Sequence, residues 1–182
     1  NVDELKYYLE LPTSDNITVA SGVSYLDLGT MKICIQANKV LNLNQGTLNA
    51  TTGSNYARSG GIALTNSVGF TNFTIKNGKL TGGSSAGLGS RDSLAGFISA
   101  VPEAVNLKVL VQDITHNDES AKGSSTASSF FKGRRTDIEF RGKIRLYNGG
   151  FNVRALNVKM YANPNDPNDP ENTNFYGYAF KN

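Results

Sequence analysis

The apolar and polar residues of this chain follow a pattern that recurs along most of its length. Residues 41–48 and 73–80 both read apolar, polar, apolar, two polar residues, Gly, polar and Leu. Leu43 and Ile75 hold equivalent places in these two segments and are 32 residues apart. A repeat with a period of roughly 20–50 residues is typical of a solenoid. Looser copies of the pattern follow at residues 107–111, 138–144 and 156–160.

The repeated unit contains a strand, a turn and a second strand, so the sequence predicts an all-β fold that is built as a β-solenoid. In such a fold the equivalent residues of successive coils stack at the strand spacing of about 4.8 Å. Two buried ladders are expected, namely Leu41, Phe73, Leu107 and Ile138, and then Leu43, Ile75, Val109 and Phe140. A glycine marks each corner, where φ is often positive. These glycines are Gly46, Gly78 and Gly142.

The sequence predicts a helix over residues 1–11, which Pro12 ends. Four apolar residues recur on one face of it, namely Val2, Leu5, Tyr8 and Leu9. An open solenoid end would expose its core and its unpaired strand edges, so we interpret this helix as the N-terminal cap. The 182 residues suit a single domain, with coils over residues 12–162 and a loop and C-terminal cap over residues 163–182.

The clearest alternation of the chain lies in residues 137–146. Side chains alternate between the two faces of a strand, so one set is expected in the core and the other in solvent. The core set is Ile138, Phe140, Ile144 and Leu146, and the solvent set is Asp137, Glu139, Arg141, Lys143 and Arg145. The solvent set belongs to a basic segment, residues 132–159, in which eight Lys or Arg residues oppose two acidic ones.

This basic segment supplies the candidate binding residues. A concentration of positive charge attracts acidic polymers, and Arg side chains pair well with sulfate and carboxylate groups. A neighbouring tyrosine can stack on a sugar ring. The alternative interpretation is an ordinary solvated basic face. The predicted ligand-binding residues are Arg141, Lys143, Arg145, Lys132, Arg134, Arg135 and Tyr147.

The residue inventory limits the possible chemistry. With one Cys and one His, the chain can form neither an internal disulfide nor a metal centre of clustered His and Cys ligands. We interpret Cys34 as a small buried residue and His116 as a solvated loop residue. Glycoside hydrolysis requires paired carboxylates, whereas the outward acids are dispersed, namely Asp27, Asp113, Asp137 and Glu139. No metal, cofactor or catalytic residue is therefore expected.

Five segments of the chain carry a family resemblance, namely residues 2–6, 16–19, 39–46, 137–144 and 149–158. Together they are similar to the pectate-lyase-like adhesive domains of surface proteins from lactobacilli and related Gram-positive bacteria. The resemblance implies a right-handed parallel β-helix, a parent protein anchored in the cell wall, and adhesion to host surface glycans or glycoproteins. It implies no catalytic residue.

These observations predict an extracellular adhesin domain that is attached to the cell wall through other parts of its parent protein. Its expected partners are host epithelial or mucus glycans and glycoproteins, above all acidic ones. As an isolated domain it is expected to be a monomer that binds neither nucleic acid nor membrane, since no apolar run approaches the ~20 residues of a membrane span. The alternatives are a β-helix polysaccharide lyase or hydrolase, including one from a phage tail spike, and a purely structural stalk.

Overall fold

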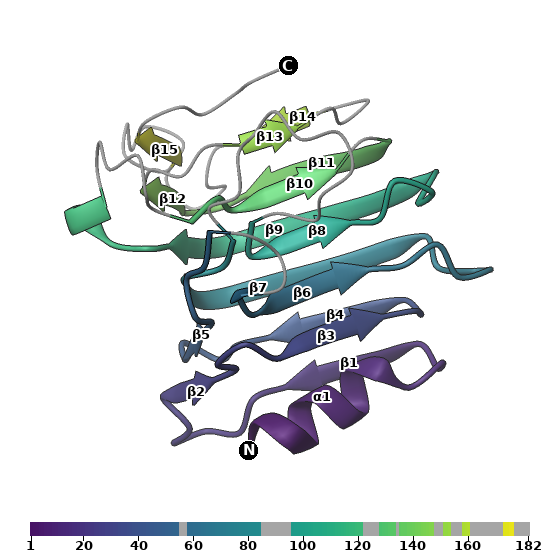
Figure 1. Ribbon diagram of the computed structural model, residues 1–182, viewed down its shortest axis with the longest axis horizontal. Helices are drawn as coiled ribbons and strands as arrows, with labels where there is room; N and C mark the ends of the chain where they lie inside the picture. The colour runs from purple at the N-terminus through teal and green to yellow at the C-terminus, as the bar shows by residue number, and fades with distance from the viewer. Residues whose placement is uncertain are drawn as a thin grey trace.

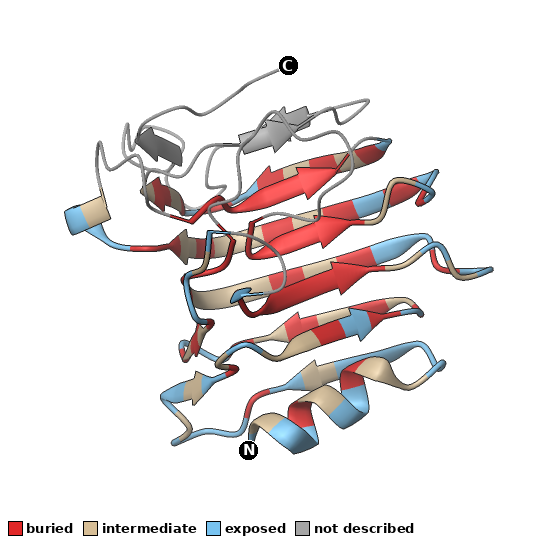
Figure 2. Cartoon of the chain, viewed as in Figure 1, coloured by how far each residue is buried: buried red, intermediate tan, exposed pale blue. Residues whose placement is uncertain are grey.

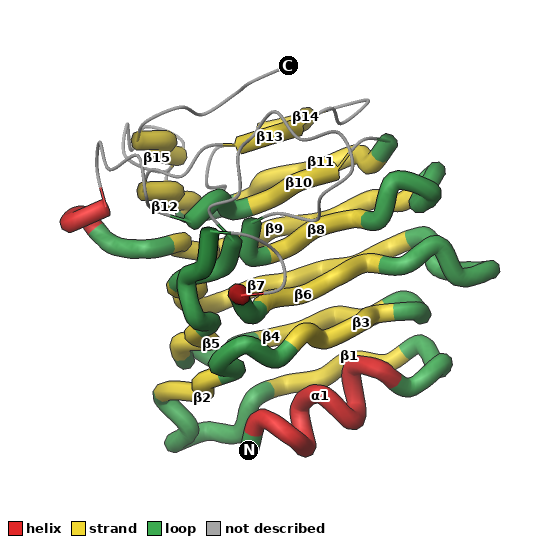
Figure 3. Tube along the Cα trace, viewed as in Figure 1, coloured by secondary structure: helices red, strands yellow, loops and turns green. Residues whose placement is uncertain are grey.

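The computed structural model describes residues 1–54, 58–84, 96–121, 128–133 and 135–147, together with the backbone of three later strands. Within these residues the chain is mostly β-strand, with parallel sheets and a single short α-helix (Figure 1, Figure 3). The predicted all-β class is therefore confirmed. The elements are α1 (Val2–Glu10), β1 (Asp15–Thr18), β2 (Tyr25–Asp27), β3 (Lys32–Ile35), β4 (Lys39–Asn42), β5 (Thr47–Asn49), β6 (Gly61–Leu64), β7 (Asn72–Thr81), β8 (Ile98–Ala100), β9 (Leu107–His116), the short 3-10 helix η2 (Glu119–Ala121), β10 (Phe131–Gly133), β11 (Thr136–Arg141), β12 (Ile144–Tyr147), β13 (Phe151–Val153), β14 (Val158–Met160) and β15 (Thr173–Tyr176).

Helix α1 lies beside β1 and β3, the first strands of the two sheets (Figure 1). The side chain of Asn1 accepts a hydrogen bond of 2.9 Å from the backbone N–H of Glu4, and the Glu4 side chain completes a capping box. Leu5 and Leu9 are buried on the face that the sequence predicts. The predicted helix is therefore confirmed, and it contributes apolar side chains to the core.

The strands form two sheets. The first sheet follows the order β1-β4-β7-β9-β11-β14, and β5 and β12 pair with the second halves of β7 and β9. The second sheet follows the order β13-β10-β8-β6-β3. All pairs of named strands in the described part of the chain are parallel, and the chain passes through the second sheet before each new strand of the order β1-β4-β7-β9-β11-β14 is added. Parallel neighbours require such crossover connections.

One hydrophobic core takes side chains from both sheets. Register partners on successive strands are buried together, and each of the following residues is at most 1 % exposed. In the first sheet they are Leu41, Ile75, Val111 and Phe140, and in the second they are Ile33, Ile62, Ile98 and Phe131. Figure 2 shows how burial follows the stacked strands. Since burying one such side chain contributes about 1.5–3 kcal/mol, these rows are a main source of stability.

The predicted ladders contain the right residues in the wrong register. Leu41 pairs with Ile75 rather than with Phe73, and Phe73 pairs with Val109 rather than with Leu107. A shift of two residues keeps every side chain on the same face of a strand. The apolar pattern therefore identifies the buried face correctly, but it does not distinguish between registers that differ by two residues.

The true register places Lys39 opposite Phe73, in an inward row. The Lys39 side chain is fully buried, and a buried charge requires partners. Its Nζ donates to the carbonyl oxygen of Tyr8 and to Oδ2 of Asp15, both at 3.1 Å. The hydroxyl of Thr13 and then the Lys39 ammonium hold the pKa of the Asp15 carboxyl below its ordinary value. Lys39 thus links α1, β1 and β4.

At two of the three corners, the residue that adopts positive φ is not the predicted glycine. Gly142 adopts positive φ, at +70°, whereas Asn44 at +51° and Gln45 at +69° do so before Gly46, and Asn77 at +59° does so before Gly78. Asn tolerates this left-handed region better than most residues. Gly78 is required for space instead, because a Cβ there would lie 2.5 Å from Cβ of Leu43.

Cys34 corrects another prediction. It is exposed rather than buried, because it lies between the inward side chains of Ile33 and Ile35 on β3. The strict alternation of the strand decides its position, and the general tendency of cysteine to be buried does not.

The turn at Gly142 gives a test of backbone and packing constraints. A Cβ on Gly142 would lie 2.1 Å from Oδ1 of Asp113, whereas a Cβ on Gly22, at φ +91°, meets nothing within 4 Å. We expect Gly22→Ala to lower the free energy of unfolding by about 1 kcal/mol from backbone strain alone. Gly142→Ala should cost clearly more, as measured by urea denaturation. Equal losses in the two variants would contradict the proposed contact with Asp113.

Candidate functional site

Four of the seven predicted binding residues lie together at the junction of β11 and β12. Arg141 ends β11, Lys143 lies in the turn, and Arg145 and Tyr147 belong to β12. Arg141 and Lys143 are exposed, and Arg145 and Tyr147 are half-buried. The four inward neighbours are buried as the alternation predicts, namely Ile138, Phe140, Ile144 and Leu146.

The other three predicted residues do not join this group. Lys132 lies on β10 in the second sheet and is only 7 % exposed, so it does not join the exposed cations at the junction of β11 and β12. It points to the outer side of its sheet, but its register partner Ser99 on that side is buried as well. Arg135 is exposed before the start of β11, at the opposite end of that strand from Arg141. Arg134 lies outside the described residues.

The parallel register adds two lysines from β7 that the sequence analysis did not select. Lys76 pairs with Gln112, which pairs with Arg141. Lys79 pairs with Thr115, which pairs with Arg145. We call the group formed by Lys76, Lys79, Arg141, Lys143 and Arg145, with Gln112 and Thr115 between its rows, the cationic surface. The repeat could have indicated that these two lysines face outward, because residues 76 and 79 hold polar places in its apolar and polar pattern.

The cationic surface has a regular spacing. In both of its rows an uncharged polar residue of β9 separates two cations, so the cations are two strand spacings apart, or about 10 Å. The rows flank a turn in which Asn77, Asp113 and Gly142 all adopt positive φ. The same backbone turn on three strands therefore fixes the relative positions of the two rows.

Two carboxylates balance part of this charge. Arg141 Nε donates to Glu139 Oε2 at 2.7 Å, and the Arg141 side chain remains 47 % exposed. Asp113 Oδ1 accepts a hydrogen bond of 2.8 Å from the backbone N–H of Lys143. An exposed ion pair is a weak interaction, so Glu139 orients Arg141 more than it contributes to stability. The surface is thus a patterned mixture of charges and not uniformly basic.

A further acidic residue lies next to Lys79. The backbone N–H and the hydroxyl of Ser120 both donate to the carboxylate of Asp118. The hydroxyl of Ser120 contributes most to holding the pKa of Asp118 below its ordinary value, and Lys79 contributes less. Asp118 is therefore ionised at neutral pH and reduces the positive potential near Lys79.

Hydrogen bonds between polar side chains also connect neighbouring strands. Asn49 Nδ2 donates to Asp27 Oδ1 at 2.9 Å, and Thr81 Oγ1 donates to Asn49 Oδ1 at 2.5 Å. The backbone N–H of Gly29 and then Asn49 hold the pKa of the Asp27 carboxyl below its ordinary value. This outward row of β2, β5 and β7 is therefore linked by side chains as well as by backbone, and the links stabilise the geometry of this part of the sheet surface.

His116 lies in the core, and the prediction of a solvated loop histidine is wrong. It pairs with Leu80 and Leu146, and it is fully buried near Phe97 and Phe130. The repeat could have indicated this burial. Leu80 is the terminal Leu of the repeat on β7, and His116 holds the equivalent inward place on the next strand, β9. Burial lowers the pKa of His116 to about 4, although a hydrogen bond to Gly82 partly opposes this shift.

The groups around His116 have structural roles. Its Nε2 donates to the carbonyl oxygen of Gly82 at 3.0 Å, and its Nδ1 has no hydrogen-bond partner among the described residues. The neighbouring side chain of Asn117 accepts from the Gly82 N–H and donates to the carbonyl oxygens of Ser128 and Tyr147. This cluster joins β7, β9 and β12 behind the cationic surface, and no carboxylate of the described ranges orients the imidazole as in a catalytic triad.

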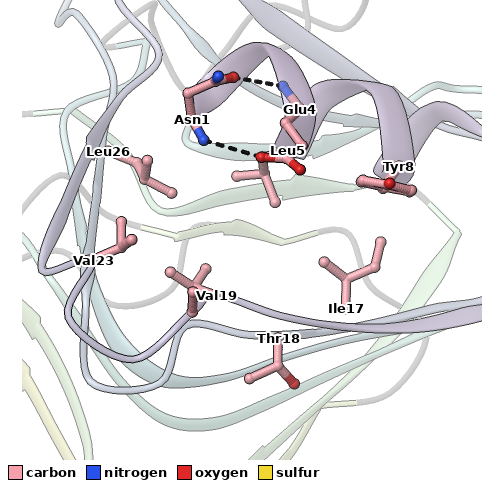
Figure 4. A pocket seen from close by; sticks show the side chains of 10 residues that line it. Asn1, Glu4, Leu5, Tyr8, Ile17, Thr18, Val19, Val23 and Leu26 are labelled. Atoms are coloured by element: carbon pink, nitrogen blue, oxygen red, sulfur yellow. Dashed lines mark hydrogen bonds and ion pairs between the residues drawn. The ribbon is translucent and has the colours of Figure 1, made fainter.

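Two pockets lie near the N-terminal end. One, of about 260 Å³, lies between α1 and residues 17–26. Figure 4 shows Leu5, Val19, Val23 and Leu26 around it, with the Asn1–Glu4 capping interactions at one side. The second, of about 220 Å³, is more polar and lies over β1, β4 and β7.

The chain was compared with known proteins. No family model matches it, and neither a curated protein nor a solved structure shows significant similarity to it. The resemblance to pectate-lyase-like adhesive domains therefore stays a prediction. No helix in the described ranges has the length and apolar character needed to cross a membrane. In the same ranges, no three His, Cys, Asp or Glu side chains gather as a possible metal site.

The buried imidazole predicts a pH dependence of stability. The unfolded chain takes up the His116 proton near its ordinary pKa of 6.5, and the folded chain does so only near about 4. The unfolded state thus binds more protons between these values, so stability falls as the pH falls. We expect a loss of about 2 kcal/mol between about pH 7 and about pH 5.

The control for this prediction is His116→Leu, which places leucine in a row that already contains Leu80 and Leu146. Urea denaturation of this variant should show a much smaller change in the free energy of unfolding over the same pH interval. An undiminished slope would mean that other groups cause the pH dependence.

Proposed function

We propose that this chain is a right-handed parallel β-helix domain of a bacterial surface adhesin and that it binds acidic glycans through the cationic surface. The fold proposal rests on strand order. The chain alternates between two parallel sheets, and each pass adds a strand next to the previous one, from β4 to β7, β9 and β11. A right-handed crossover between parallel strands of one sheet is by far the commoner hand.

The binding proposal rests on one observation, the two parallel rows of cations around a shared turn. Lys76 and Arg141 bracket Gln112, and Lys79 and Arg145 bracket Thr115. An extended polyanion presents acidic groups at intervals, and it can meet several cations of such a surface at once. The amide of Gln112 and the hydroxyl of Thr115 add uncharged hydrogen-bonding groups for sugar hydroxyls.

The interactions of the carboxylates near the cationic surface favour binding over catalysis. A glycosidase uses one carboxylic acid as a proton donor and a second carboxylate as base or nucleophile. Here Glu139 pairs with Arg141, and Asp113 holds the Lys143 backbone N–H. Both carboxylates therefore have structural roles. We propose an adhesin without catalytic activity or cofactor, located outside the cell and attached to its wall through the parent protein, with host epithelial or mucus glycans as partners.

A pair of variants with equal net charge tests this proposal. Lys79→Gln/Lys143→Gln removes two charges from the cationic surface. Lys6→Gln/Arg58→Gln removes two charges elsewhere, from α1 and from an exposed position before β6. Charge-assisted hydrogen bonds are worth about 1.5–3 kcal/mol each. We expect the first variant to bind immobilised sulfated glycans about tenfold or more weakly, and the control to bind nearly as the wild type does.

The same assay at low and at physiological salt provides a second measurement. Exposed charges are screened as the ionic strength rises, so binding by the wild type should weaken. Equal affinities of both double variants, or affinity that salt does not change, would reject the cationic surface as the binding site. A polysaccharide lyase would instead release unsaturated products from hyaluronan or chondroitin sulfate.

A further inference from the structure

The polar pocket over β1, β4 and β7 has the features of a small binding site. It has a volume of about 220 Å³. Its lining residues come from three neighbouring strands of the first sheet and the residues just before them, namely Ser14, Asp15, Asn16, Asn38, Lys39, Val40, Asn72 and Thr74. Nearly all of these side chains can form hydrogen bonds, and a single apolar residue, Val40, lies among them.

The register arranges the outward side chains of this pocket in a row. Asn16 pairs with Val40, and Val40 pairs with Thr74. Two polar groups therefore lie one strand spacing, or about 4.8 Å, on either side of an apolar one. A sugar ring has the matching character, since its hydroxyls lie at the rim and its C–H groups form an apolar face. Val40 can contact that face while Asn16 and Thr74 meet hydroxyls.

Several hydrogen-bonding groups of the pocket have no partner within the protein. In the described part of the chain, the side chains of Ser14, Asn16 and Thr74 make no hydrogen bond to another protein group. Asn38 uses its Oδ1 to accept from the backbone N–H groups of Thr71 and Asn72, at 2.8 and 3.0 Å. That contact fixes its side chain and leaves its Nδ2 donor for a ligand.

The charge of the pocket indicates which ligands suit it. Its two charged lining residues, Asp15 and the buried Lys39, belong to the inward row and form an ion pair with each other at 3.1 Å, and its outward side chains are uncharged. The site therefore has no net charge of its own and offers an acid no unpaired cation.

We propose that this pocket binds an uncharged sugar ring. It is separate from the cationic surface but lies on the same outer face of the first sheet, because Asn72, Thr74 and Lys76 alternate outward along β7. A glycan that contains both uncharged and acidic sugars would therefore contact both sites, with its chain following the strands. This last step rests on the proposed function, whereas sugar binding by the pocket does not.

The test is a titration of isotope-labelled protein with methyl glycosides of glucose, galactose and N-acetylglucosamine, followed by NMR. At least one glycoside should cause saturable shifts of the side-chain amide signals of Asn16, Asn38 and Asn72. Asn16→Ala/Thr74→Val should weaken this binding about tenfold or more, because two neutral hydrogen bonds are lost. Thr18→Val is the control, since Thr18 lies further along β1 and does not line this pocket.

Val40→Phe gives an independent check, because a larger side chain between Asn16 and Thr74 fills the space for the ring and should abolish the shifts. The Lys79→Gln/Lys143→Gln variant should bind the glycosides as the wild type does. The proposal is overturned if none of the three glycosides causes saturable shifts, or if the pocket variants bind as tightly as the control. Loss of acidic-glycan binding alone would concern the cationic surface and leave the pocket unaffected.

Discussion

The in-register parallel pairing of β4, β7, β9 and β11 is the constraint on which the rest of the structure depends. Each of these strands provides a template of backbone hydrogen bonds for the next, so every side chain has a partner directly above or below it. Inward rows become buried apolar ladders, such as the one through Leu41, Ile75 and Val111. Outward rows become lines of polar groups at a fixed spacing. Core and surface are therefore two results of one pairing.

Lys39 and His116 both interrupt the apolar inward rows, and each is accommodated differently. Lys39 lies near the N-terminal end, where Asp15 and a carbonyl oxygen of α1 are within reach, so its charge is fully partnered. His116 lies in the interior among apolar side chains, so it remains neutral and makes its hydrogen bond to Gly82. The first residue attaches the helix to the sheets, and the second is expected to make stability sensitive to acid.

The outer face of the first sheet carries both of the proposed binding sites. Its cationic surface is formed where β7, β9 and β11 turn together, and its uncharged pocket is formed where β1, β4 and β7 begin. β7 contributes to both, through Thr74 in the pocket and Lys76 on the cationic surface. Because the strands hold both sites at fixed distance, an extended ligand would bind to a preformed surface with little ordering cost.

The sequence by itself determined which side chains are buried wherever apolar and polar residues alternate. Ile138, Phe140, Ile144 and Leu146 were assigned to the core from parity alone, and α1 was found from its apolar face and from Pro12. The proposed binding residues could be identified from the sequence only in part, because Arg141, Lys143 and Arg145 are close in sequence whereas Lys76 and Lys79 join them only through β9. Only the tertiary structure decided the register, since a shift by two residues preserves the buried face. It also decided the burial of Lys132 and His116, because the burial of a residue depends on neighbours from distant segments, and a local pattern does not contain them.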